Sequence, residues 1–71
     1  MRKKDIVVSN PKIMSGTPCF AGTRVPVQTL FDYLEAGDPM DEFLDDFPTV
    51  SREMAVALLE SAKQELLAAA N

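Results

Sequence analysis

Apolar residues recur with helical spacing in three separate stretches of this 71-residue chain. The first stretch, residues 26–36, has apolar residues at i, i+3, i+4 and i+7, the spacing that places side chains on one face of an α-helix. These positions are Val27, Leu30, Phe31 and Leu34. Pro26 suits the first turn of a helix, and Gly37 suits its end because glycine readily adopts a left-handed conformation. The pattern therefore predicts a first helix over residues 26–36.

A second, shorter helix is predicted directly after the first one. Asp38 can cap a helix N-terminus and Pro39 fits the first helical position, while Asp41 and Glu42 fall in the first turn, where the helix dipole favours negative charge. The apolar stripe of this helix consists of Met40, Phe43, Leu44 and Phe47. Pro48 cannot continue the hydrogen bonding of a helix and therefore marks its end.

A third helix is predicted over about residues 52–69, with Ser51 as its N-cap. Its buried seam is expected to consist of Met54, Leu58, Ala62 and Leu66, with Leu59 and Leu67 widening the apolar face near the end. The second helix, the turn at 48–51 and the third helix have the form of a helix-turn-helix. DNA-binding proteins use this form, but three helices also adopt it simply in order to pack. The uncharged end of the chain, residues 66–70, either frays or docks on a partner as a helix in a groove.

Residues 5–25 predict short extended pieces joined by turns. The β-branched run at 6–8 is the clearest strand, and further very short pieces are expected at 13–14, 19–20 and 24–25. None is long enough to form a stable sheet alone, so they pair with each other or with a second copy of the chain. The sequence thus predicts a mainly α, single-domain fold over residues 1–71. A short β and turn segment, 1–25, precedes a three-helix, helix-turn-helix-like bundle with an apolar C-terminal tail, 26–71.

Size and composition indicate that a partner chain contributes stability. A domain this small buries only about 60% of the surface of its unfolded chain. One cysteine and no histidine exclude a disulfide within the chain and argue against a zinc site, so we expect neither a metal nor a cofactor. Cys19 is interpreted as a buried, unreactive residue in preference to a reactive thiol. The chain has neither the apolar run of a signal peptide nor the roughly 18 apolar residues of a membrane span, so we expect a cytoplasmic protein without membrane contact.

Charge is unevenly distributed along the chain. The formal net charge of −4 disfavours nucleic-acid binding by the chain as a whole, because such binding rests on neutralising phosphates with basic side chains. Residues 32–46 hold seven acids and no base, so this stretch repels DNA and attracts a basic protein surface. The candidate DNA contacts are the basic residues Arg2, Lys3, Lys4, Lys12 and Arg52.

The most specific segment is residues 16–27, in which two glycines bracket a short apolar run and a Thr-Arg-Val-Pro sequence follows. Arg24 either pairs with an acid, such as Asp45, Asp46 or Glu60, or faces a partner whose carboxylates its guanidinium group can grip. Thr23 is expected to close a turn. Without histidine, a second cysteine or a converging acid–base set, we expect that the protein is not an enzyme.

Several of these positions carry a resemblance to a known family. The pattern consists of Gly16-x-Pro18-x-x-x-Gly22-Thr23-Arg24-Val25-Pro26-Val27, then Gly37, then Phe43-Leu44-x-Asp46-Phe47-Pro48, and then Ala57-Leu58. Over residues from about 6 to 62, the chain resembles the small prokaryotic family catalogued as domain of unknown function 433. Members of that family are similar to VapB-type antitoxins and are often encoded beside a PIN-like nuclease toxin. Their fold is described as a helix-turn-helix-like three-helix domain with a short β N-terminal part, so the resemblance implies an antitoxin or a DNA-binding regulator.

Two functions follow from the residues and the resemblance together. In the first, the chain is the antitoxin of a type II toxin–antitoxin pair, which neutralises a PIN-like nuclease toxin and can also repress its own operon. The candidate contacts with that partner are Arg24, Asp41, Asp45, Asp46, Leu66 and Leu67. In the alternative, the chain is a dimeric helix-turn-helix transcription regulator that binds operator DNA without a toxin partner. Both functions imply a homodimer or a hetero-oligomer.

Overall fold

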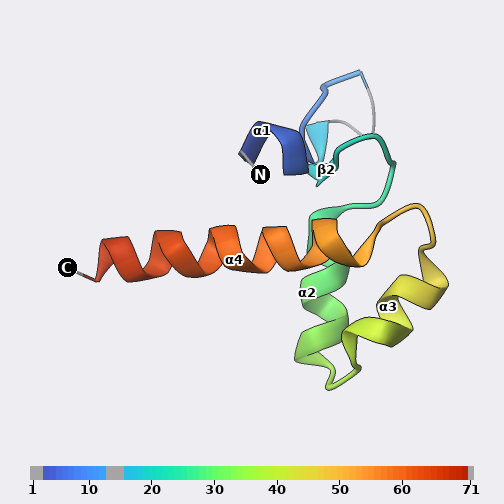
Figure 1. The fold of residues 1–71 in the computed structure, drawn as a ribbon. Coiled ribbons are helices and arrows are strands. Elements are labelled where there is room, and N and C mark those ends of the chain that lie inside the picture. The colour runs from blue at the N-terminus through green and yellow to red at the C-terminus, as the bar shows by residue number, and fades with distance from the viewer. Residues whose placement is uncertain (1–2, 13–15, 71) are drawn as a thin grey trace.

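The computed structural model describes residues 3–12 and 16–70, and most of this part of the chain is helical. The three main helices are α2 (Val27–Glu35), α3 (Met40–Asp46) and α4 (Arg52–Ala69). A short helix, α1 (Lys3–Ile6), and an antiparallel pair of strands, β1 (Val7–Val8) and β2 (Cys19–Phe20), precede them. Figure 1 shows α2 and α3 on one side of the N-terminal half of α4, with α1 and β2 on the other side. The predicted fold, mainly α with short N-terminal strands, is confirmed.

The first helix, α2, ends through the glycine that the sequence indicates. Gly37 has a φ of 86°, in the left-handed region. Its N–H donates to the carbonyl of Leu34 at 3.1 Å, and the N–H of Asp38 donates to the carbonyl of Tyr33 at 2.9 Å. These two bonds form a Schellman motif, which satisfies carbonyl groups that the end of a helix would otherwise leave unpaired.

The two prolines expected inside the first turn of a helix lie one residue before it, at the N-cap. Pro26 is the N-cap of α2, with a ψ of 138°, and Pro39 is the N-cap of α3, with a ψ of 156°. The prediction that Asp38 caps the second helix is therefore wrong. Asp38 belongs to the motif that closes α2, since its N–H is bonded to Tyr33, and α3 begins with no side-chain cap.

A tight turn joins α3 to α4 as the sequence predicts. The N–H of Val50 donates to the carbonyl of Phe47 at 3.0 Å, which places Pro48 at the second position of the turn, where proline is favoured. Pro48 also keeps Phe47 out of the helical region, and Phe47 has a φ of −127° and a ψ of 72°. Ser51 is the N-cap of α4, because its hydroxyl accepts a hydrogen bond of 3.1 Å from the N–H of Met54.

The buried residues of the hydrophobic core come from every element except β1, whose half-buried Val7 packs against them. The buried members of the core are Ile6, Phe20, Val25, Leu30, Phe43, Val50, Ala55 and Leu58. Phe43 is fully buried, and its ring centroid lies 6.0 Å from that of Phe20, 5.5 Å from that of Tyr33 and 5.2 Å from that of Phe47. The ring of Phe43 therefore connects the β segment with α2 and α3.

The C-terminal half of α4 departs from the predicted seam. Ala55 and Leu58 are buried and Ala62 is half-buried, but Leu66 is 72% exposed and Leu67 is 59% exposed. The prediction that Leu66 belongs to a buried seam is therefore wrong for the single chain. An 18-residue helix is about 27 Å long, and Figure 1 shows its red C-terminal end running beyond the other helices, which leaves no element of the described chain to cover it.

The N-terminal segment contains fewer strand residues than predicted. Ile6, expected in a strand, ends α1 instead and is buried at 1% exposure, and this helix packs against α4. Arg24 and Val25 are not in a strand, and Cys19 forms an isolated bridge with Pro26 just beyond them. The extended piece expected at 13–14 lies outside the described residues. Packing of Ile6 into the core thus outweighs the β preference of its sequence neighbourhood.

Candidate functional site

The segment from Phe20 to Val25 forms a closed hairpin loop. The N–H of Phe20 donates to the carbonyl of Val25 at 2.9 Å, and the N–H of Thr23 donates to the carbonyl of Phe20 at 3.0 Å. Gly22 stands at the third position of this inner turn with a φ of 77°, which a type II turn requires there. The N–H of Ala21 donates to the carbonyl of Ile6 at 2.8 Å, which fastens the loop to the end of α1.

Thr23 closes the same loop with its side chain. Its hydroxyl donates to the carbonyl of Phe20 at 2.8 Å and accepts from the N–H of Val25 at 3.1 Å. The predicted turn-closing role of Thr23 is therefore confirmed. We call residues 22–24 the Gly-Thr-Arg loop; its first two residues supply the conformation and the closure, and the side chain of Arg24 takes part in neither.

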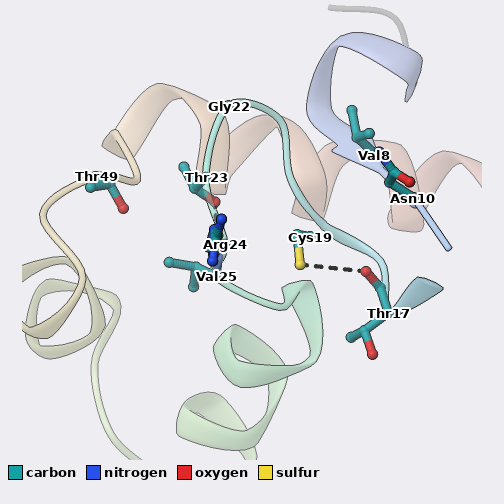
Figure 2. Close-up of a pocket in the computed structure, with 9 residues that line it drawn as sticks. All are labelled: Val8, Asn10, Thr17, Cys19, Gly22, Thr23, Arg24, Val25 and Thr49. Carbon is teal, nitrogen blue, oxygen red and sulfur yellow. Dashed lines mark hydrogen bonds between the residues drawn. The ribbon is translucent and has the colours of Figure 1, made fainter. Parts of the chain in front are cut away.

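A surface hollow of about 630 Å³ lies beside the Gly-Thr-Arg loop. Figure 2 shows nine residues that line it: Val8, Asn10, Thr17, Cys19, Gly22, Thr23, Arg24, Val25 and Thr49. They come from β1, β2, the connection between these strands, the Gly-Thr-Arg loop with the residue after it, and the turn before α4. In this view Arg24 lies between Thr49 on one side and Cys19 and Thr17 on the other. The hollow therefore brings together residues up to 41 positions apart in the sequence, from Val8 to Thr49.

Arg24 is exposed and forms no ion pair with a residue of the described ranges. The carboxylate of Asp46 instead accepts a hydrogen bond from Tyr33, and that of Glu60 lies 3.4 Å from the amine of Lys63. The interpretation in which Arg24 pairs with Asp45, Asp46 or Glu60 is therefore wrong. An ion pair of Arg24 is not needed to hold the segment from Phe20 to Val25, because backbone hydrogen bonds and the hydroxyl of Thr23 already fix its conformation.

Cys19 forms part of the wall of the hollow. It is 6% exposed, and its Sγ donates to the carbonyl of Thr17 at 3.4 Å (Figure 2). The predicted burial of Cys19 is confirmed, and its lack of reactivity stays a prediction.

The acidic residues of α3 lie on the opposite side of α4 from α1 (Figure 1). Asp41 pairs with Arg52 at the start of α4, and Asp46 accepts a hydrogen bond of 2.6 Å from the hydroxyl of Tyr33. That bond raises the pKa of Tyr33 from 10.0 to about 12, aided by desolvation and by the negative charges of Asp46, Glu42 and Asp38. Asp45 is exposed between these two acids in the sequence.

The structure describes the side chains of two candidate DNA contacts, Lys12 and Arg52. Arg52 is engaged with Asp41, and Lys12 is an exposed loop residue whose backbone N–H donates to the side-chain oxygen of Asn10 at 2.9 Å. The backbone of Lys3 and Lys4 forms the start of α1. The side chains of these two residues and the whole of Arg2 lie outside what the structure describes.

Sequence reasoning missed the polar rim of the hollow. Asn10, Thr17 and Thr49 fall in loops where no periodic pattern marks them, and only the folding of three segments onto one another brings them together. The Tyr33–Asp46 hydrogen bond was missed for the same reason, since it joins two different helices. Over the part of the chain that the structure describes, no helix combines the length and apolar character needed to cross a bilayer.

The fold and the site define a small helical domain with an N-terminal pair of strands and the Gly-Thr-Arg loop, which is closed by its own backbone and by the hydroxyl of Thr23. Residues 7–62 match the family model described as protein of unknown function (DUF433), and the chain belongs to this family. Its match to the family extends over all but the two ends, so the Gly-Thr-Arg loop and the three main helices lie largely within it.

Two relatives extend this comparison. The chain is 38% identical over 50 residues to a protein from Sinorhizobium fredii (strain NBRC 101917 / NGR234) named uncharacterized protein y4eO, and the match covers 70% of this chain and 23% of that protein. It is also similar to the crystal structure, at 2.00 Å resolution, of a DUF433 member protein from Anabaena variabilis ATCC 29413. The TM-score is 0.72 at 28% identity, with 86% of this chain and 60% of that chain covered. The chain thus spans less than a quarter of the first relative and about three fifths of the second.

Proposed function

We propose that this protein is an antitoxin-like binding module that binds and neutralises a PIN-like nuclease toxin in the cytoplasm and acts by binding rather than by catalysis. The observation that carries this proposal is the exposed apolar end of α4, where Leu66 is 72% and Leu67 is 59% exposed on a helix that runs past the rest of the domain. Large apolar side chains gathered at such a position are typical of a helix that docks on another protein.

Two further features support a protein partner. A mainly apolar hollow of about 240 Å³ lies next to the exposed end of α4, and its lining includes Ile6, Phe31, Leu58 and Ala62. A partner chain could therefore cover the leucines and the hollow together. On the other side of the core, the exposed acids of α3 attract a basic surface, which is the charge that an RNA-cleaving protein presents to its substrate. The choice of a nuclease rests on the resemblance to VapB-type antitoxins.

Direct DNA binding by the helix-turn-helix form has less support. The first turn of α4 offers Arg52, which is paired with Asp41, and Glu53, which repels phosphate. Autorepression within this proposal would therefore rely on a second copy or on the toxin for additional positive charge.

The test is co-expression of the chain with the product of its neighbouring gene, followed by size-exclusion chromatography and an RNA-cleavage assay. A stable complex with suppressed cleavage is expected. Leu66→Glu should weaken the complex, whereas Gln64→Glu, which adds the same charge to the same exposed helix without removing a leucine, should not. Asp45→Lys should also weaken it, in contrast to Asp32→Lys on the exposed side of α2.

Two results would overturn the proposal. The first is no complex with a folded nuclease partner; the second is a complex whose affinity is unchanged by Leu66→Glu and Asp45→Lys. Salt-sensitive binding to upstream DNA by the chain alone, with affinity lost on deletion of residues 1–4, would favour the transcription regulator instead.

A further inference from the structure

We propose that the hollow beside the Gly-Thr-Arg loop binds a small organic anion, one that carries a phosphate or carboxylate group on a partly apolar body. This inference does not depend on the proposed function, because the lining of the hollow includes neither Leu66, Leu67 nor any acid of α3. It rests on the charge, the size and the chemical lining of the hollow.

The charge of the lining is the opposite of the charge of the chain. The protein has 11 acids against seven bases, yet the residues that line the hollow include Arg24 and no acid. Arg24 forms no ion pair within residues 3–12 and 16–70, so its guanidinium group keeps its donors for a ligand. Guanidinium binds phosphate and carboxylate groups through two parallel hydrogen bonds, which gives Arg24 the chemistry of an anion anchor.

The rest of the lining suits an anion with an apolar part. Thr17, Thr49 and Asn10 supply hydroxyl and amide donors around Arg24, while Val8, Cys19 and Val25 supply apolar surface. The side-chain oxygen of Asn10 already accepts from Lys12, and its amide nitrogen carries two donors. A few polar groups placed on a mainly apolar wall are typical of small-molecule sites.

Size and surroundings favour a small ligand over a nucleic acid. The volume of about 630 Å³ lies within the range of about 300–1,000 Å³ that is typical of small-molecule pockets. An extended polyanion reaching beyond the hollow would meet a chain with a net charge of −4 and a middle segment with seven acids. A compact anion held at Arg24 contacts a lining that contains no acid, whereas a polyanion would extend beyond that lining.

The test is an NMR titration of the full chain, in which backbone amide signals are followed as ligand is added. The probes are phenyl phosphate and benzoate, with inorganic phosphate as the anion without an apolar body and benzyl alcohol as the neutral control. Saturable shifts are expected for residues 22–25, Thr17 and Thr49 with phenyl phosphate or benzoate, at millimolar concentration. Weaker binding is expected for inorganic phosphate, and no saturation for benzyl alcohol. The tighter of the two organic anions identifies the headgroup.

Variants separate a built site from general charge attraction. Arg24→Gln should weaken binding by about tenfold or more, as expected for the loss of a charge-assisted pair. Arg52→Gln removes the same charge outside the hollow and should leave the affinity unchanged. Thr49→Val, on the other rim, should weaken binding several-fold, and the spectra themselves report that each variant is folded. The proposal is overturned if neither organic anion gives saturable shifts, or if Arg24→Gln and Arg52→Gln change the affinity equally.

Discussion

The hydroxyl of Tyr33 donates a hydrogen bond of 2.6 Å to Oδ2 of Asp46, which joins the last turn of α2 to the last residue of α3. The ring of Tyr33 stands edge-on to Phe43 and to Phe47, with interplanar angles of 80° and 77°. One side chain thus makes both a polar and an aromatic contact between the two helices, and this contact fixes how they pack.

The Tyr33–Asp46 bond predicts an unusual titration. Tyr33 is the only tyrosine and the chain has no tryptophan, so the tyrosinate absorbance reports on this residue alone. Its pKa is expected at about 12, and Asp46→Asn should move the pKa back toward 10.0, because it removes both the charge and the strongest acceptor. Asp45→Asn is the matched control and should change the midpoint little. An unchanged midpoint in Asp46→Asn would contradict the assignment.

The same shift predicts a pH dependence of stability. The pKa of Tyr33 is higher in the folded protein than its ordinary value of 10.0, so the folded state holds the phenolic proton more tightly than the unfolded state does. The resulting contribution to the free energy of unfolding is fully present below pH 10 and is lost as the pH rises to about 12. Urea unfolding at several pH values in this window should show a decline that Asp46→Asn makes smaller.

Truncation of a leucine side chain to alanine should destabilise the fold strongly at position 30 and hardly at all at position 66. Leu30 is fully buried, and Leu30→Ala is expected to lower the free energy of unfolding by about 2–5 kcal/mol. Leu66 is 72% exposed, and Leu66→Ala is expected to change it by no more than about 0.5 kcal/mol in the isolated chain. Chemical denaturation of both variants provides the measurement. A large loss in Leu66→Ala would mean that the end of α4 is covered in solution by another chain.

Thr23 should be required for its hydroxyl rather than for its shape. Thr23→Val keeps the volume of the side chain but leaves the N–H of Val25 without its acceptor. This substitution should lower the free energy of unfolding by about 1–3 kcal/mol. Thr23→Ser retains the hydroxyl and should recover most of this loss. Thermal unfolding of the two variants tests the difference, and equal stability of both would show that the loop does not depend on the side-chain bond.

Gly37 should be required for its backbone conformation. An added Cβ at this position meets no atom within 4 Å, so the cost of Gly37→Ala comes from the φ of 86° and not from a clash. That cost is about 1–2 kcal/mol. Gly37→Asn should cost less, because asparagine tolerates the left-handed region better than alanine does. Denaturation curves in which alanine and asparagine are equally tolerated would contradict this account.

Features governed by local sequence could be predicted, and features governed by contacts between segments could not. Gly37 ends α2 and Ser51 caps α4 as expected, because both roles depend on the conformation or the hydroxyl of one residue and its near neighbours. Ile6 was placed in a strand because it heads a β-branched run, yet it is buried against other elements at the end of α1. Its position follows from packing, which the local sequence does not contain.

The candidate site divides in the same way. The tight turn before Arg24 could be predicted from the glycines and the proline of its segment, but the ion pairs expected of Arg24 could not be tested without knowing which acids come near. The structure engages Asp46 with Tyr33 and Glu60 with Lys63, and it leaves Arg24 exposed beside a hollow. Helical periodicity likewise assigned Leu66 to the core, since a periodic pattern shows which face of a helix is apolar but not how far the rest of the domain extends along it.

The closure of the Gly-Thr-Arg loop has a consequence for how this protein can change over time. Every hydrogen bond that closes the loop uses the backbone or the hydroxyl of Thr23, and none uses the side chain of Arg24. Substitutions at position 24 can therefore alter what the loop recognises while the fold around it is preserved. The domain keeps the residue that selects a ligand separate from the residues that maintain the scaffold, so a single mutation can produce a new specificity without a loss of stability that later mutations would have to repair.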